Sequence, residues 1–240
     1  EKVILWTMFT NNEAKLWKNS IEYMHDAVYY YSLWNGDYPY KHCTAVDGTI
    51  AAGGGMEYPN VTVIGESGNA FFLEEVIMHE VGHNWFYGML GSNERDHPWM
   101  DEGINSFDEL RYMRLKYPEY NILLNDLPSF ISNMFDLKDY TNKNIQGELM
   151  YFMNAWTGKD QPIELHSCKY TYINYGGIVY SKTAIVFDYL MAYLGEDIMN
   201  QCKRTYFEKW KFKHHQPEDL KIVFEEVSGK NLSNFLTSLN

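Results

Sequence analysis

One short motif constrains this chain more than any other feature: His79-Glu80-Val81-Gly82-His83, an H-E-x-x-H sequence. Apolar residues recur around it at helical spacing, which predicts a buried helix over residues 70–89. Two histidines four positions apart lie on one face of a helix, so both imidazoles can bind the same zinc ion. The glutamate between them then lies beside the open coordination position, where it can take a proton from bound water. We therefore predict His79 and His83 as metal ligands and Glu80 as the general base.

A catalytic zinc site needs a third protein ligand and keeps its fourth position open. A third histidine six residues after His83 is excluded, because position 89 is Met89 and the glycine of that pattern is replaced by Phe86. The next predicted helix begins near Asp101-Glu102, and 18 residues separate His83 from Glu102. That length allows a helix end, a loop and a return, so we predict Glu102 as the third ligand of a His₂Glu site.

Glu109 is a second acidic residue on the helix that begins near Glu102. The two glutamates share one face of that helix, together with Ser106. A carboxylate in this place can accept a hydrogen bond from a ligating histidine and orient it. A solvated charge on the helix surface explains Glu109 equally well, and the sequence leaves both interpretations open.

The rest of the chain predicts an α+β fold with a small β-region near the N-terminus followed mostly by helices. A glycine-rich stretch, residues 51–59, separates the two predicted strands, and its Gly53, Gly54 and Gly55 can admit a close backbone approach by a ligand. Residues 117–173 have an irregular pattern with short helices. No repeat or linker divides the chain, which predicts one domain over residues 1–240. The other predicted elements are helices over 12–34, 101–115, 180–194, 197–210 and 217–227, and strands over 43–50 and 61–64.

Composition restricts the partners. The chain has 32 Asp and Glu against 20 Lys and Arg, a formal net charge of −12, so we expect no nucleic-acid partner. No apolar run approaches the ~20 residues of a membrane span, so no transmembrane segment is predicted. The three cysteines form neither a disulfide framework nor a C-x-x-C metal site. Aromatic residues make up 17% of the chain but are spread along it, which favours an aromatic core over a carbohydrate-binding surface.

These motifs together resemble the aminopeptidase N family of gluzincin zinc metallopeptidases. H-E-V-G-H-N-W-F and M-D-E-G match the family's H-E-x-x-H-x-W-F and third-ligand segments. Gly54-Gly55-Met56-Glu57 matches most of its G-x-M-E-N substrate motif, and Tyr180-Ser181-Lys182 matches its Y-x-K element. The resemblance is clear from about Tyr38 to Leu194 and looser over the C-terminal helices. It implies a thermolysin-like zincin catalytic domain whose N-terminal β-domain, and often a C-terminal domain, lie outside this chain but contact it.

The resemblance also implies an activity: one zinc ion per chain and hydrolysis that removes N-terminal residues from peptides. It gives Tyr180 the role of hydrogen-bond donor to the developing oxyanion. It implies that Glu57 binds the substrate's α-ammonium group. It also implies that the bound peptide is lined by Gly53, Gly54, Gly55 and Met56. The family takes a second ammonium anchor from its N-terminal domain, so this chain alone is expected to bind zinc but to cleave free-amine substrates weakly.

Four positions depart from the family pattern, and two rival functions stay open. Tyr58 replaces an asparagine, Tyr87-Gly88 replaces Gly-Asn, and Thr183 replaces a glycine, but none of these changes removes a predicted ligand or the base. A thermolysin-like endopeptidase differs from an aminopeptidase in accepting N-acetylated substrates. A non-catalytic scaffold with a metallopeptidase fold is the other alternative, and the intact Glu80 with its full ligand set argues against it.

Overall fold

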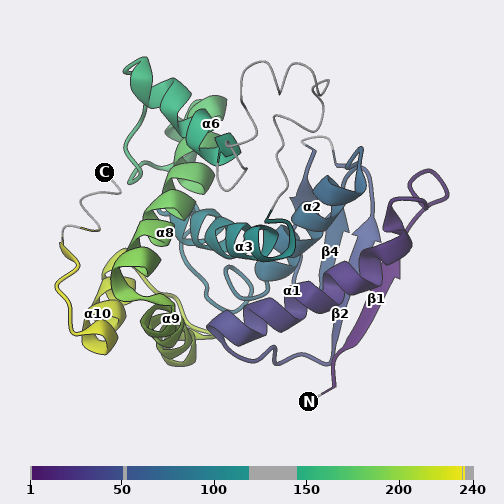
Figure 1. The fold of residues 1–240 in the computed structure, drawn as a ribbon, viewed down its shortest axis with the longest axis horizontal. Helices are drawn as coiled ribbons and strands as arrows, with labels where there is room; N and C mark the ends of the chain where they lie inside the picture. Colours follow the sequence, from purple (N-terminus) through teal and green to yellow (C-terminus); the bar gives the residue numbers. More distant parts are fainter. Residues whose placement is uncertain (1, 51–52, 119–144, 234, 236–240) are drawn as a thin grey trace.

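The structure is a computed structural model that describes residues 2–50, 53–118, 145–233 and 235. Residues 51–52, at the start of the predicted glycine-rich stretch, and residues 119–144, within the segment predicted to be irregular, lie outside the described residues. Within the described residues, a small sheet near the N-terminus is followed by helices, as predicted (Figure 1).

A four-stranded sheet forms the N-terminal part, and its spatial order is β1 (Ile4–Met8), β2 (His42–Asp47), β4 (Val61–Ile64) and β3 (Gly55–Met56). The first three strands are parallel, with Leu5 opposite Cys43 and Ala45 opposite Thr62. The short β3 pairs antiparallel with β4 and places Met56 opposite Val63. Strand β1 was not predicted. Its side chains alternate between exposed and half-buried, and Trp6 is 53% exposed, so no buried apolar run marks it.

Two helices cover the sheet and lead to the H-E-x-x-H motif (Figure 1). Helix α1 (Ser20–Asn35) connects β1 to β2 and packs against α2 (Ala70–Gly82), which also contacts β4. The prediction that the first helix begins at residue 12 was wrong, because turns and a short 3-10 helix, η1 (Trp17–Asn19), precede it. The start of α2 is fixed by Asn69, whose side chain accepts a hydrogen bond from the Phe72 N–H at 2.9 Å.

Helix α2 ends at Gly82, seven residues before the predicted end at residue 89. Glycine is a weak helix former, and at this position its missing side chain leaves space for the Tyr31 hydroxyl and the Asn105 amide. The backbone of His83 nevertheless keeps near-helical angles of −64° and −10°, and its N–H donates to His79 O at 3.3 Å. The two histidines therefore stay one turn apart although the helix itself has ended.

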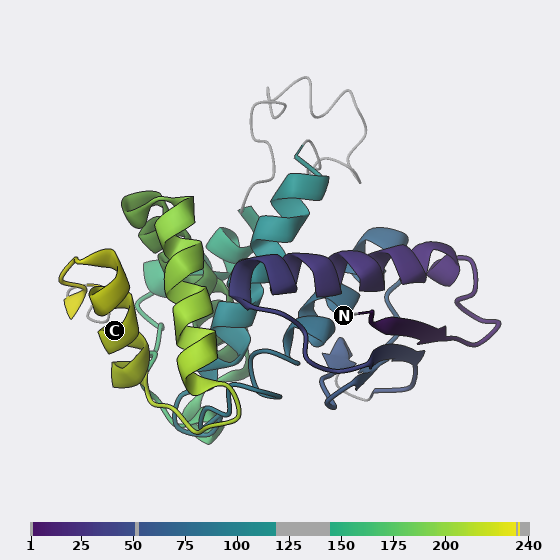
Figure 2. The same ribbon diagram turned by 90° about the horizontal axis from the view of Figure 1, so that it is seen from below.

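Helix α3 (Glu102–Lys116) lies between the sheet layer and the C-terminal helices (Figures 1 and 2). It packs against α2 on one side and α8 on the other. The predicted C-terminal helices are present with small differences in their ends: α8 (Thr183–Leu194), α9 (Glu196–Trp210) and α10 (Pro217–Ser228). The segment predicted to be irregular contains α6 (Ile145–Trp156), η4 (Ser167–Lys169) and α7 (Tyr172–Asn174), and a π-helix, η5 (Tyr175–Lys182), leads into α8.

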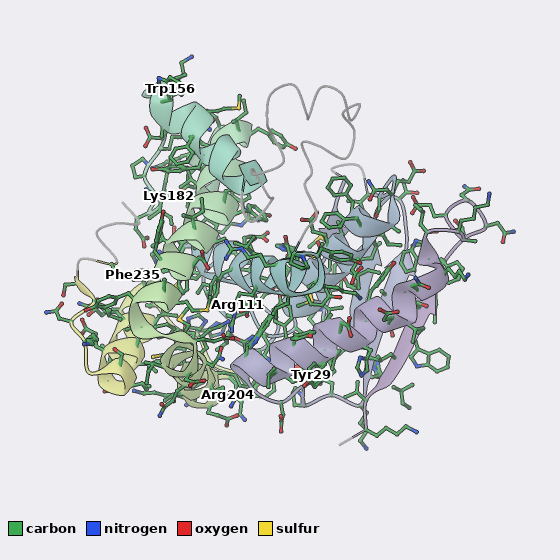
Figure 3. The ribbon with its side chains drawn as sticks, viewed as in Figure 1. Tyr29, Arg111, Trp156, Lys182, Arg204 and Phe235 are labelled. Atoms are coloured by element: carbon green, nitrogen blue, oxygen red, sulfur yellow. The ribbon has the colours of Figure 1, made fainter. Side chains whose placement is uncertain are left out.

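Buried charged groups fix α3 against its neighbours. Arg111 lies between α3 and the C-terminal helices (Figure 3), with Nη2 2.9 Å from both Glu196 Oε1 and Asn200 Oδ1. Its guanidinium carbon also lies 4.1 Å from the Trp34 ring centroid at the end of α1. Asp108 pairs with the buried Lys203 of α9. These contacts connect α1, α3 and α9, and they hold the middle of α3 in place. Across the described residues, every helix is too short or too polar to span a bilayer.

Candidate active site

Helices α2 and α3 bring the three predicted metal ligands to one point. Nε2 of His79, Nε2 of His83 and Oε2 of Glu102 lie 3.1 Å from one another in all three pairs. The side chains are 12%, 1% and 15% exposed, so the cluster lies in the interior with limited access from one side. The three side chains meet because the loop after α2 turns back toward it through a short 3-10 helix, η2 (Pro98–Met100). Helix α3 then begins at Glu102, beside the two histidines.

Each imidazole is held from its far side by a carboxylate. His79 Nδ1 lies 2.8 Å from Glu109 Oε2, and His83 Nδ1 lies 2.7 Å from Asp101 Oδ1. An acceptor at Nδ1 favours the tautomer that carries its proton there, which leaves the Nε2 lone pair facing the common point. Glu109 thus contacts His79, a predicted ligand, which is the contact that an orienting role for Glu109 requires.

The electrostatic surroundings favour a positive charge between the two rings. Burial lowers the pKa of His79, but the carboxylates of Glu102 and Glu109 raise it more, to about 10. In the same way Asp101 and Glu102 overcome burial and hold the pKa of His83 well above its ordinary value. Two imidazole nitrogens and a carboxylate oxygen are a common ligand set of catalytic zinc, with bonds of about 2.0–2.2 Å that can span atoms at this spacing. The residues present therefore fit a zinc ion.

Glu80 lies beside this cluster and packs against the glycine-rich strand. It is 6% exposed, and its Oε2 has no hydrogen-bond partner among the described residues. A Cβ atom at Gly55 would lie 2.3–2.5 Å from the Glu80 side chain, so the carboxylate occupies the space that a larger residue would need. Burial raises the pKa of Glu80 to about 7, and the charge of Glu57 adds to that effect.

Tyr180 reaches the site from η5, on the side opposite the sheet. Its ring lies 5.8 Å from the His79 ring at an interplanar angle of 26°. Burial and the negative charge of Glu102 raise the pKa of Tyr180 well above its ordinary value, so the hydroxyl keeps the proton it would donate. A π-helix is rare and occurs often at functional sites, because the extra residue per turn redirects a side chain.

The glycine-rich segment forms the other side of the site. Gly53 and Gly54 have φ values of +74° and +72°, a region that favours glycine, and β3 lies at the edge of the sheet. Glu57 directly follows β3, and its negative charge acts on the Glu80 carboxylate. An exposed strand edge can bind an extended peptide through its backbone groups.

Two acidic residues near the metal cluster were not predicted: Asp101 and Glu94. Carboxylate oxygens of Glu57, Glu94 and Asp101 lie within 4.8 Å of one another. Asp101 directly precedes the third predicted ligand, and that position was the available signal for it. Glu94 belongs to a segment predicted only as a loop, and its place depends on the path of that loop.

Comparison with known proteins places these observations in a family. The profile described as "Peptidase family M1 domain" matches residues 19–239. Aminopeptidase M1-D of Oryza sativa subsp. japonica is 26% identical over 164 residues, which are 68% of this chain and 17% of that protein. The puromycin-sensitive aminopeptidase of Caenorhabditis elegans is 26% identical over 163 residues, 68% of this chain and 16% of that protein.

Solved structures agree on the fold. The M1 zinc metallopeptidase of Deinococcus radiodurans superposes with a TM-score of 0.65 at 14% identity, covering 92% of this chain and 43% of that one. Aminopeptidase A of Legionella pneumophila gives 0.70 at 13% identity, covering 97% and 25%. The helices, the small sheet and the H-E-x-x-H segment define a zinc-metallopeptidase fold, as predicted. The chain belongs to peptidase family M1. It spans about 17% of the length of the curated relatives it matches first.

Proposed function

We propose that this chain hydrolyses peptide bonds with a bound zinc ion and removes residues from the N-terminus of peptides. The observation that carries the proposal is the meeting of His79, His83 and Glu102 at 3.1 Å spacing beside a buried, unpartnered Glu80 carboxylate. Three convergent ligand atoms with an acid–base group next to them are the arrangement that metal-assisted hydrolysis requires.

The residues divide the chemistry among them. His79, His83 and Glu102 would hold the zinc ion, which would supply a Lewis acid to polarise a carbonyl group and acidify water. Glu80 takes the proton of the attacking water at its carboxylate and later delivers it to the leaving amine. Tyr180 donates a hydrogen bond to the carbonyl oxygen as that oxygen becomes negative, a contact that is strongest in the transition state.

Glu57 gives the proposal its exopeptidase character. Gly53, Gly54, Gly55 and Met56 present the strand edge along which a peptide lies, and Glu57 is a half-buried carboxylate at its end. A peptide's free α-ammonium pairs with such a group, which places the first peptide bond at the metal cluster. Blocking the amine by acetylation removes that pairing, and this distinguishes an aminopeptidase from an endopeptidase.

Zinc analysis together with matched peptide substrates tests the proposal. The purified chain should hold one zinc ion, and a tripeptide with a free N-terminus should be cleaved at least about tenfold faster than its acetylated form. Glu57→Gln should erase most of that difference. Equal cleavage of both peptides identifies an endopeptidase. Bound zinc with no cleavage of either peptide identifies a non-catalytic scaffold.

A further inference from the structure

A cluster of three carboxylates lies beside the candidate metal site. The oxygens of Glu57, Glu94 and Asp101 lie within 4.8 Å of one another. Asp101 is hydrogen-bonded to His83 Nδ1 at 2.7 Å, but no ion pair among the described residues neutralises Glu57 or Glu94. Like charges this close repel, and the charge of Glu57 adds to partial burial in raising the pKa of Glu94. A cation bound between the two carboxylates would relieve that repulsion.

The cluster opens on the same space as the candidate metal centre. Tyr175 packs edge-to-face against Tyr180, with ring centroids 5.8 Å apart and an interplanar angle of 65°. Burial raises the pKa of Tyr175, and the charges of four carboxylates add to it in the order Glu102, Asp101, Glu94 and Glu57. All four charges therefore act on one side chain, and Asp101, which is bonded to His83, connects the pair formed by Glu57 and Glu94 to the metal cluster.

A second observation points to a ligand in that space. Glu80 is buried and its Oε2 has no partner among the described residues, which costs free energy unless a bound group satisfies it. Its side chain packs against Gly55, and Glu57 follows two residues later, directly after β3. The unsatisfied acceptor and the unpaired carboxylates thus border one site.

We infer that Glu94, together with Glu57, binds the α-ammonium group of the peptide substrate and so acts as a specificity-determining residue. The inference rests on the proposed function, because it names the residues that bind the N-terminal end of the same peptide substrate. A primary ammonium has three N–H donors and can bridge two carboxylate oxygens at this separation. Glu94 lies on the loop between α2 and η2, so this chain would supply both anchors of the ammonium itself.

Peptide binding without turnover tests this role. Zinc-loaded Glu80→Gln protein is titrated calorimetrically with Ala-Ala-Phe and with acetyl-Ala-Ala-Phe. We expect the free peptide to bind more tightly. Adding Glu94→Gln should lower the affinity for the free peptide by about five- to tenfold and leave the affinity for the acetylated peptide unchanged. The effect is modest because Glu94 is exposed and its charge is partly screened. Glu94→Asp should recover part of the loss, and Glu226→Gln on α10 is the charge-matched control.

Each other outcome has a defined meaning. An unchanged preference in Glu94→Gln overturns the role of Glu94 while the proposed function stands. Equal binding of free and acetylated peptides in the parent protein overturns the aminopeptidase proposal itself, and the inference with it. A loss confined to peptides that begin with lysine overturns the α-ammonium assignment. A fall from two metal ions to one in Glu94→Gln identifies the cluster as a metal site and overturns ammonium binding.

Discussion

The two sides of the candidate site are built differently. On the helical side, His79 and His83 each have a carboxylate on the far nitrogen, and both lie in well-packed helix contacts. On the strand side, Gly53, Gly54 and Glu57 lie at an exposed sheet edge, and Glu57 has no ion pair among the described residues. The helical side is arranged before any ligand arrives, whereas the strand side is left with unsatisfied groups.

This difference follows from what each side binds. A metal site needs fixed ligand geometry, and partners behind the ligands supply it. A peptide side must stay open to many sequences, so it offers backbone groups and one or two charges rather than a closed pocket. Variants on the helical side should therefore change metal binding and turnover, and variants on the strand side should change substrate preference or the placement of Glu80.

The largest effect is expected from Glu80→Gln. The substitution keeps the size of the side chain but removes the group that takes and returns a proton. We expect kcat to fall by about 10²–10⁴ with zinc retained, because Glu80 is a base and not a ligand. Steady-state kinetics and metal analysis on the same sample measure both quantities. Full activity in Glu80→Gln would show that another residue is the base.

Tyr180→Phe should have the next largest effect. The ring and its stacking on His79 remain, while the hydroxyl donor is lost. We expect kcat to fall by about 10²–10³ with little change in KM, as for removal of one oxyanion donor. Tyr189→Phe, at a 72% exposed position on α8, is the matched control. A change in KM alone would place Tyr180 in the wall of the binding site instead.

Gly55→Ala tests the contact between the two sides. Its Cβ would collide with the Glu80 side chain at 2.3–2.5 Å, so the carboxylate must move. Displacing a reacting group by about 1 Å costs about 10² in rate. Gly229→Ala, just after α10 and outside the candidate site, is the control, because nothing lies within 4 Å of its Cβ position. It should strain the loop but leave kcat within about twofold. Equal kcat in both variants, measured at saturating substrate, would mean that the strand does not set the position of Glu80.

Much of the fold could be predicted from local patterns. Helical periodicity predicted α2 and α3, and the i, i+4 spacing of His79 and His83 predicted that their imidazoles share one face. Strand β1 was missed because its Ile4, Trp6 and Met8 face outward, where no burial signal exists. The early end of α2 was missed because the apolar helical pattern continues past Gly82, and the residues that pack against Gly82, Tyr31 and Asn105, come from elsewhere in the chain.

The candidate site was predictable in its ligand positions and less so in its supporting groups. Glu102 follows from its distance along the chain, and Glu109 from helix geometry. Glu94 has no such signal, because its contact with Glu57 joins a loop to a strand end and depends on the whole fold. Sequence spacing thus predicts which side chains on one helix or strand lie close together. It does not predict contacts between side chains that loops bring together.

The smallest expected effect belongs to Glu109→Gln. Glu109 accepts a hydrogen bond from His79 Nδ1 at 2.8 Å, and its negative charge increases the electron density that His79 offers a metal. The amide of glutamine keeps an acceptor but loses the charge. We expect zinc affinity to fall by about 10–100-fold, as is typical of groups behind a ligand. Competition with a fluorescent chelator measures it.

Two controls separate this effect from a general loss of structure. Glu218→Gln removes the same charge from an exposed position on α10 and should leave zinc affinity unchanged. Glu109→Asp keeps the charge on a shorter chain, so it should recover part of the affinity if the charge matters. If Glu109→Gln binds zinc as tightly as the parent protein, Glu109 is a solvated charge. The contrast between an ordered helical side and an open strand side would then rest on Asp101 alone.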